Sequence, residues 1–294
     1  MTASLRALLT NVIDYAGLFP PAELSLDESI RNYARYRTEH EAWMLGRFIC
    51  PAARLKELAP YVAELFGRSG PIDVSALGRP GQTREGFDGF SGEFEAIREF
   101  ERNQGGRARV SVFEGQLPDG VGFASAGNRR EIFLESTRNT AESIHYVIQA
   151  AGVARHGFKL RTGGVEASAF PPSELIAFAL IMCRDHSVPI KFTAGLHHPI
   201  RHFNKSVDTK MHGFINVFVA GVLAHVEKLN EQRLVEILDD EDAASFTFDD
   251  DSLRWRDHRA TTEQVASLRK DRITSFGSCS FDEPRDDLRA LGWL

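Results

Sequence analysis

The chain has 294 residues, of which 43% are hydrophobic, 10% aromatic and 26% charged, and its net charge is −6 at pH 7. This composition supports a sizeable core and excludes a disordered chain, and the lack of a basic excess argues against nucleic acid as a main partner. The longest nearly apolar run, FINVFVAGVLAHV, is too short to span a bilayer, so no membrane partner is expected. The three cysteines lie far apart without CxxC spacing, which predicts a reducing, cytoplasmic location.

Short β-branched or aromatic runs alternate with longer amphipathic segments along the chain. A strand over 12–19 is expected first, followed by a helix over 25–43 in which Ser25 and Glu28 have capping-box spacing. The next expected elements are a strand over 46–51, a helix over 52–66, a strand over 71–81, a helix over 92–104, strands over 109–115 and 130–137, a helix over 139–152, a strand within 157–164, a helix over 171–186 and a strand within 188–199.

The end of the chain is less regular. Residues 200–230 look apolar and helical, 245–256 resemble a hairpin, and 261–272 have a helical pattern. We expect 200–270 to be an insertion packed on the main domain, ahead of a last strand over 273–281 and a closing helix over 283–294.

Strands that alternate with helices at this spacing predict parallel pairing with right-handed crossovers. Eight such strands would make a single TIM-like (β/α)8 barrel that comprises the whole chain, 1–294. An open doubly wound sheet is the alternative, but no GxGxxG motif follows the first strand.

Lys159 and Lys191 each lie in the middle of a predicted buried strand, where lysine is rare. Because side chains alternate along a strand, Lys159 shares a face with Arg161, and Lys191 shares one with Thr193. In a barrel of this kind the active site lies at the carboxyl ends of the strands. Candidate polar residues at those ends also include Asp14, Glu114, Glu135, Thr162 and Ser278.

Two ammonium groups on adjacent buried strands would have lowered pKa values, because burial and a neighbouring cation both disfavour the charged amine. A neutral amine can attack a carbonyl and form a Schiff base, while a carboxylate such as Glu135 holds the second lysine protonated. The alternative is that Lys159, Lys191, Glu114 and Glu135 form a structural ionic network that plugs the barrel mouth. In that case Lys159→Met should be neutral or stabilising.

Two loop motifs extend the candidate site. The RTGG segment offers the backbone N–H groups of Gly163 and Gly164 before a helix, which suits a phosphate or carboxylate that Arg161 would clamp; a plain glycine turn is the alternative. In LHHP, the adjacent side chains of His197 and His198 point in opposite directions, which argues against one shared metal ion. A histidine of this pair is a candidate proton carrier or substrate contact.

The order of these motifs resembles that of the deoxyribose-phosphate aldolases, which are class I aldolases on an α/β barrel. VIDYAGLFPPA, FICPAARLKELAPYV, IFLEST, FKLRTGG, PIKFTAG and ITSFGSCS are similar, in order, to strands of that family. The sequence departs from the family at Arg161, where a small hydroxyl residue is usual, in LHHPIRHF, and in the insertion after residue 200. RTGG and TAGLHHP also resemble motifs that a set of bacterial proteins share.

The resemblance implies that Lys159 forms the Schiff base, that Lys191 lowers its pKa, and that Asp14 matches an aspartate near the site. It leads us to expect a cofactor-independent lyase for a small anionic carbonyl substrate, with Asp14, Glu114 or His197 carrying protons. A metal-assisted enzyme that uses Glu114, Glu135 and a histidine, and a non-catalytic ligand-binding barrel, remain alternatives. A homo-oligomer is compatible with the apolar run FINVFVAGVLAHV, which suits a subunit interface or a barrel helix equally well.

Overall fold

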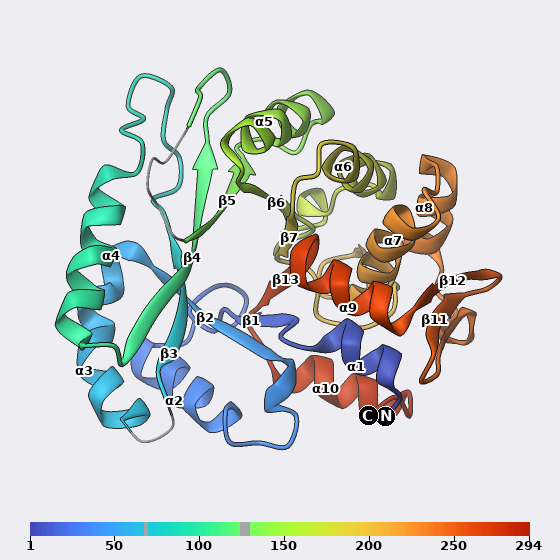
Figure 1. Cartoon of the computed structure of the whole chain (residues 1–294), viewed down its shortest axis with the longest axis horizontal. Coiled ribbons are helices and arrows are strands. Elements are labelled where there is room, and N and C mark those ends of the chain that lie inside the picture. The colour runs from blue at the N-terminus through green and yellow to red at the C-terminus, as the bar shows by residue number, and fades with distance from the viewer. Residues whose placement is uncertain (68–69, 124–129) are drawn as a thin grey trace.

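The computed structural model describes residues 1–67, 70–123 and 130–294 (Figure 1). In this part of the chain, eight parallel strands close into a barrel in the order β1-β13-β7-β6-β5-β4-β3-β2, which confirms the predicted TIM-like α/β fold. The barrel strands are β1 (Ile13–Tyr15), β2 (Leu45–Pro51), β3 (Ile72–Leu77), β4 (Ala108–Leu117), β5 (Glu131–Ser136), β6 (Gly157–Arg161), β7 (Ile190–Thr193) and β13 (Ile273–Ser278).

Helices surround this barrel as Figure 1 shows. They are α1 (Ala3–Leu9), α2 (Leu26–Tyr36), α3 (Leu55–Phe66), α4 (Ser91–Gln104), α5 (Ala141–Ala154), α6 (Ser173–Asp185), α7 (Phe214–Val226), α8 (Glu231–Asp239), α9 (Thr262–Asp271) and α10 (Asp282–Ala290), with short 3₁₀ turns at Ala42–Met44, Ala52–Arg54, Ala167–Ala169 and Ala243–Ser245. The Ser25 side chain accepts a hydrogen bond from the Glu28 N–H and begins α2 as predicted. The helix ends at Tyr36, however, where the predicted helix continued to residue 43.

The segment 200–270 combines helices with two small antiparallel sheets. Its first part is a hairpin of β8 (His202–Asn204) and β9 (Thr209–Met211), so the prediction of helix from residue 200 was wrong before α7. The predicted hairpin at 245–256 is present as β10 (Phe246–Phe248) and β11 (Ser252–Trp255), and β12 (His258–Thr261) adds a third strand. In Figure 1 this sheet lies beside α1, at the same side of the barrel as both chain termini.

The apolar helix α7 is part of the barrel wall. Every residue from Phe214 to Ala224 is buried within one chain, against α6, α8, α9 and β13. Asn216 fixes its first turn, because its Nδ2 donates to the carbonyl oxygens of Ile237 (2.8 Å) and Asp240 (2.7 Å). Of the two interpretations of FINVFVAGVLAHV, the structure therefore supports the barrel helix.

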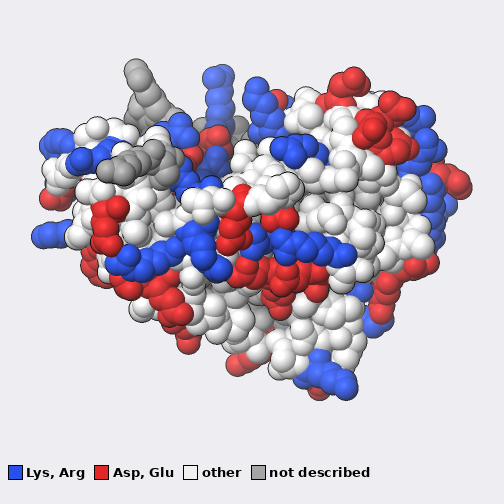
Figure 2. All heavy atoms as spheres, turned by 90° about the horizontal axis from the view of Figure 1, so that it is seen from below, with Lys and Arg blue, Asp and Glu red and all other residues white. Residues whose placement is uncertain are grey.

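The molecular surface carries acidic and basic side chains side by side. Figure 2 shows one face on which both kinds are interspersed rather than gathered into patches of one sign. No helix within the described residues is both long enough and apolar enough to cross a membrane.

Candidate functional site

Five charged side chains point into the barrel and are almost fully buried. They are Asp14, Glu114, Glu135, Lys159 and Lys191, none of which is more than 5% exposed. The strand register explains part of this arrangement, since Lys159 on β6 lies opposite both Glu135 on β5 and Lys191 on β7. Buried charges are tolerated only when each is paired, so the contacts among these groups decide what they do.

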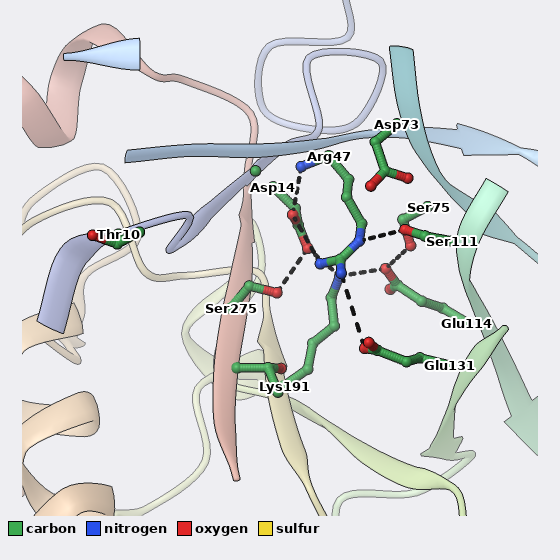
Figure 3. A network of polar contacts seen from close by, with 12 residues as sticks. Thr10, Asp14, Arg47, Asp73, Ser75, Ser111, Glu114, Glu131, Lys191 and Ser275 are labelled. Atoms are coloured by element: carbon green, nitrogen blue, oxygen red, sulfur yellow. Dashed lines mark hydrogen bonds and ion pairs between the residues drawn. The ribbon is translucent and has the colours of Figure 1, made fainter. Parts of the chain in front are cut away.

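These side chains form a row in which carboxylates and cations alternate. Lys191 Nζ lies 2.6 Å from Asp14 Oδ2 and 2.5 Å from Glu114 Oε1. Lys159 Nζ lies 3.0 Å from Glu114 Oε2 and 2.7 Å from Glu135 Oε2. Arg161 ends the row, with Nη2 at 3.2 Å from Glu135 Oε1. We call these six residues the ion row. Figure 3 shows its Asp14–Lys191–Glu114 portion at the centre of the barrel.

Two hydroxyl groups, a backbone N–H and the Arg47 guanidinium, whose Nη1 lies 3.9 Å from Asp14 Oδ1, also contact the buried carboxylates. The Ser75 hydroxyl donates to Glu114 (2.5 Å), and the Ser275 hydroxyl donates to Asp14 (2.7 Å). The backbone N–H of Arg47 also donates to Asp14 (2.7 Å). Ser75, Ser275 and Arg47 were not predicted as partners. The inward position of a serine on an alternating strand does not identify the group that it meets, and a backbone N–H has no signal in the residue type.

The carboxylates reverse the predicted effect on the pKa of Lys159. Burial lowers that pKa, but the charges of Glu135 and Glu114 raise it by more, so it lies above its ordinary value. The expectation of a lowered pKa was wrong because Glu114 stands between the two ammonium groups, with one oxygen on each. The pKa values of Glu114 and Asp14 are lowered despite burial, chiefly by the charge of Lys191.

A cavity of about 670 Å³ opens above the ion row, at the carboxyl ends of the strands. Its floor includes Glu114, Glu135 and Lys159, whereas Asp14 and Lys191 lie beneath it and do not line it. Most of its walls are apolar: they include Phe19, Pro20, Ile49, Pro51, Leu77, Pro80, Val165 and Ala169. Lys159 is therefore the lysine that a bound small molecule can reach.

The predicted substrate-binding residues divide into two groups. Arg161, Gly163, Gly164 and Thr193 line the cavity, as does His197. Thr162 and Ser278 are buried and do not line it. The Thr162 hydroxyl instead donates to the carbonyl oxygen of Ala194 (2.6 Å) and thereby joins the loops after β6 and β7.

The glycines of RTGG have a packing role that the sequence did not reveal. A Cβ on Gly163 would lie 2.7 Å from the Cα of Gly195, so the two loop backbones touch at this point. The predicted helix does not follow directly, because α6 begins only at Ser173. An anion at Gly163 and Gly164 would therefore meet loop backbone rather than a helix N-terminus.

The two adjacent histidines contact carboxylates of α10, and they share Glu283, which lies 3.8 Å from His198 Nε2. His197 Nδ1 lies 3.0 Å from Glu283, and His198 Nδ1 lies 2.5 Å from Asp287. Within the described ranges, no group of three or more His, Cys, Asp or Glu side chains is arranged to hold a metal ion. Cys279 also lines the cavity, where burial raises the pKa of its thiol. A raised pKa disfavours the thiolate form that a nucleophilic cysteine needs.

Comparison with known protein families and with curated proteins gave no match. The function must therefore be inferred from the cavity, the ion row beneath it and the motifs described above.

Proposed function

We propose that the protein is a Schiff-base lyase of the class I aldolase kind, acting on a small carbonyl compound that carries an anionic group. The observation that carries this proposal is the position of Lys159. Its Nζ lies on the floor of an apolar cavity, within 3.0 Å of two carboxylates that can exchange protons with it. The resemblance to deoxyribose-phosphate aldolases, which implies the same lysine, supports the choice.

In the resting protein the raised pKa keeps Lys159 as an ammonium, so a proton must leave before attack. Glu135 or Glu114 accepts that proton, and the Nζ lone pair then forms a bond to the carbonyl carbon. The carboxyl group gives this proton to the former carbonyl oxygen, which becomes a hydroxyl group, and then accepts a proton from the nitrogen. The carboxyl group gives this second proton to the hydroxyl group, which leaves as water. The overall change is ammonium plus carbonyl to iminium plus water, with no net gain or loss of protons. In the cleavage step a proton carrier takes the proton of the hydroxyl group on the β-carbon, and that C–O bond becomes a carbonyl as the Cα–Cβ bond breaks. The electron pair of the broken bond passes to the iminium, which becomes a neutral enamine.

The remaining candidate residues have consistent positions for this chemistry. Arg161 is 43% exposed at its side chain and faces the cavity, where it can bind the anionic group beside Thr193 and the Gly163–Gly164 backbone. Lys191 and Asp14 do not line the cavity; Lys191 contacts Glu114 directly and is itself paired with Asp14. Glu114 and His197, both at the cavity, are the candidate proton carriers for the carbon–carbon step.

Reductive trapping with cyanoborohydride tests the proposal. A panel of small aldehydes and keto acids should give a secondary-amine adduct that intact mass detects and peptide mapping locates on Lys159. The adduct should disappear in Lys159→Met and in Lys159→Arg. The arginine variant keeps a cation between the two carboxylates and so controls for misfolding. Failure of the whole panel to form an adduct on Lys159 would refute the proposal.

The complete pairing within the ion row favours a second candidate, a barrel that binds a ligand without forming a covalent bond to it. Each oxygen of Glu114 already meets a cation, as expected for a structural network. This candidate predicts reversible binding of small anions to the cavity without an adduct. The trapping experiment therefore separates the two.

A further inference from the structure

Glu135 connects the nucleophile to the residue that would bind the substrate anion. Its Oε2 lies 2.7 Å from Lys159 Nζ, and its Oε1 lies 3.2 Å from both Nε and Nη2 of Arg161. The three side chains all line the cavity. They differ in accessibility, since Lys159 and Glu135 are buried whereas the Arg161 side chain is 43% exposed. A ligand therefore reaches Arg161 without first displacing the other two.

The charge on Arg161 favours the state in which Glu135 is ionised and Lys159 is protonated. A cation beside a carboxylate stabilises the ionised form, and it has no comparable attraction for the neutral acid. While Arg161 stays on Glu135, transfer of the proton from Lys159 to Glu135 is disfavoured, and less neutral amine is present to attack a carbonyl. Neutralising or removing Arg161 weakens this preference, and a proton can then cross the 2.7 Å contact to Glu135.

We propose that Arg161 and Glu135 form an anion-operated switch, in which the anionic group of a bound substrate draws Arg161 off Glu135 and so frees Glu135 to take the proton of Lys159. This inference rests on the proposed Schiff-base function and adds how the substrate starts it. The exposed guanidinium of Arg161 lies at the cavity, and its paired N–H groups suit a carboxylate or phosphate group of a bound ligand. Neutral aldehydes, which leave Arg161 on Glu135, then react poorly.

The test supplies the two parts of a substrate separately. Propionaldehyde serves as the neutral carbonyl compound and acetate as the anion, with chloride at equal ionic strength as the reference. The initial rate of cyanoborohydride-trapped adduct on Lys159 is measured by intact mass and peptide mapping. In the wild-type protein we expect acetate to raise this rate by about tenfold, since one adjacent opposite charge alters a proton equilibrium by that factor or more.

Three variants sharpen the result. Arg161→Gln should trap propionaldehyde faster than wild type without acetate and should gain nothing from acetate, because Glu135 has permanently lost this cation. Arg161→Lys should retain the response to acetate. Arg233→Gln, which removes a surface arginine paired with Glu236 on α8, is the matched control and should behave as wild type.

The outcomes distinguish the switch from the function on which it rests. Adducts on Lys159 whose rate is the same with acetate and chloride would overturn the switch and leave the Schiff-base function standing. An unchanged or slower rate in Arg161→Gln without acetate would also overturn it, as would an equal acetate response in that variant. Absence of any adduct from the larger panel would overturn both.

Discussion

Replacement of Lys191 by methionine tests whether the ion row stabilises the barrel. The change removes an ammonium that lies 2.6 Å from Asp14 and 2.5 Å from Glu114, and all three side chains are at most 1% exposed. Breaking a buried ion pair by removing one partner costs about 3–5 kcal/mol. Asp14 keeps its hydrogen bond from Ser275, and Glu114 keeps Lys159, so we expect the lower end.

A loss of about 3 kcal/mol should lower the melting temperature by about 5 °C for a chain of 294 residues, given an unfolding entropy of about 2.1 cal/mol/K per residue. Calorimetry and urea unfolding at pH 7 measure the change. Lys210→Met, which removes an exposed lysine paired with Glu241, is the matched control and should change stability by less than about 1 kcal/mol.

The pH dependence gives a second, independent check on Lys191→Met. The folded pKa values of Asp14 and Glu114 lie below their ordinary values of 3.8 and 4.5, so the stability that they contribute is present above those values and is lost as the pH falls. Without Lys191 both pKa values rise, and protonation at lower pH relieves the two carboxylates that have lost this cation. The difference from wild type should therefore shrink between pH 7 and pH 4. A difference that is constant over this range, or a stability equal to that of the Lys210→Met control, would refute the argument.

Two other substitutions test contacts outside the ion row. Gly163→Ala should destabilise the protein by about 1–3 kcal/mol in urea unfolding, because the added Cβ would lie 2.7 Å from the Gly195 backbone; wild-type stability would disprove the contact. Trp255→Phe should lower the free energy of unfolding by about 2 kcal/mol in the same assay, since it removes the buried indole N–H that donates to Asp240 Oδ2 at 2.9 Å. An unchanged stability would mean that this hydrogen bond does not hold the β10-β11-β12 sheet in place.

The barrel could be predicted because its signals are local. Each strand is a short apolar run, and the helices between them have caps or amphipathic faces that the sequence shows directly. The hairpin before α7 was missed because β8 and β9 are only three residues each and expose Phe203, so their pattern does not alternate clearly. The early end of α2 was missed because Thr38 bonds back to the Arg35 carbonyl, a local competition that periodicity does not reveal.

The sequence predicts which side chains of one strand share a face, but it does not predict which side chains of different strands meet inside the barrel. Alternation correctly placed Lys159 and Arg161 on one face, as their shared contact with Glu135 shows. The position of Glu114 between the two lysines depends on how β4 faces β6 and β7 after closure. Because strand tilt and register set that geometry, the sign of the pKa change at Lys159 did not follow from the sequence. For the same reason Lys159→Met is now expected to destabilise the protein, since it would leave two buried carboxylates without this cation.

The ion row also bears on the order of events during folding. Within the row, Lys159 and Glu114 are 45 positions apart in the sequence, and Lys191 and Asp14 are 177 apart. The hydrogen bond from Ser275 to Asp14 joins residues that are 261 positions apart. The last strand, β13, lies between β1 and β7 in the barrel. The barrel therefore closes only when β13 is present, and a nascent chain cannot complete the ion row until synthesis is nearly finished. We expect contacts between residues so far apart in the sequence to form after the rate-limiting step of folding, and contacts of that kind mainly slow unfolding. The paired charges at the centre of the barrel should therefore affect how long the closed barrel persists more than how quickly it forms.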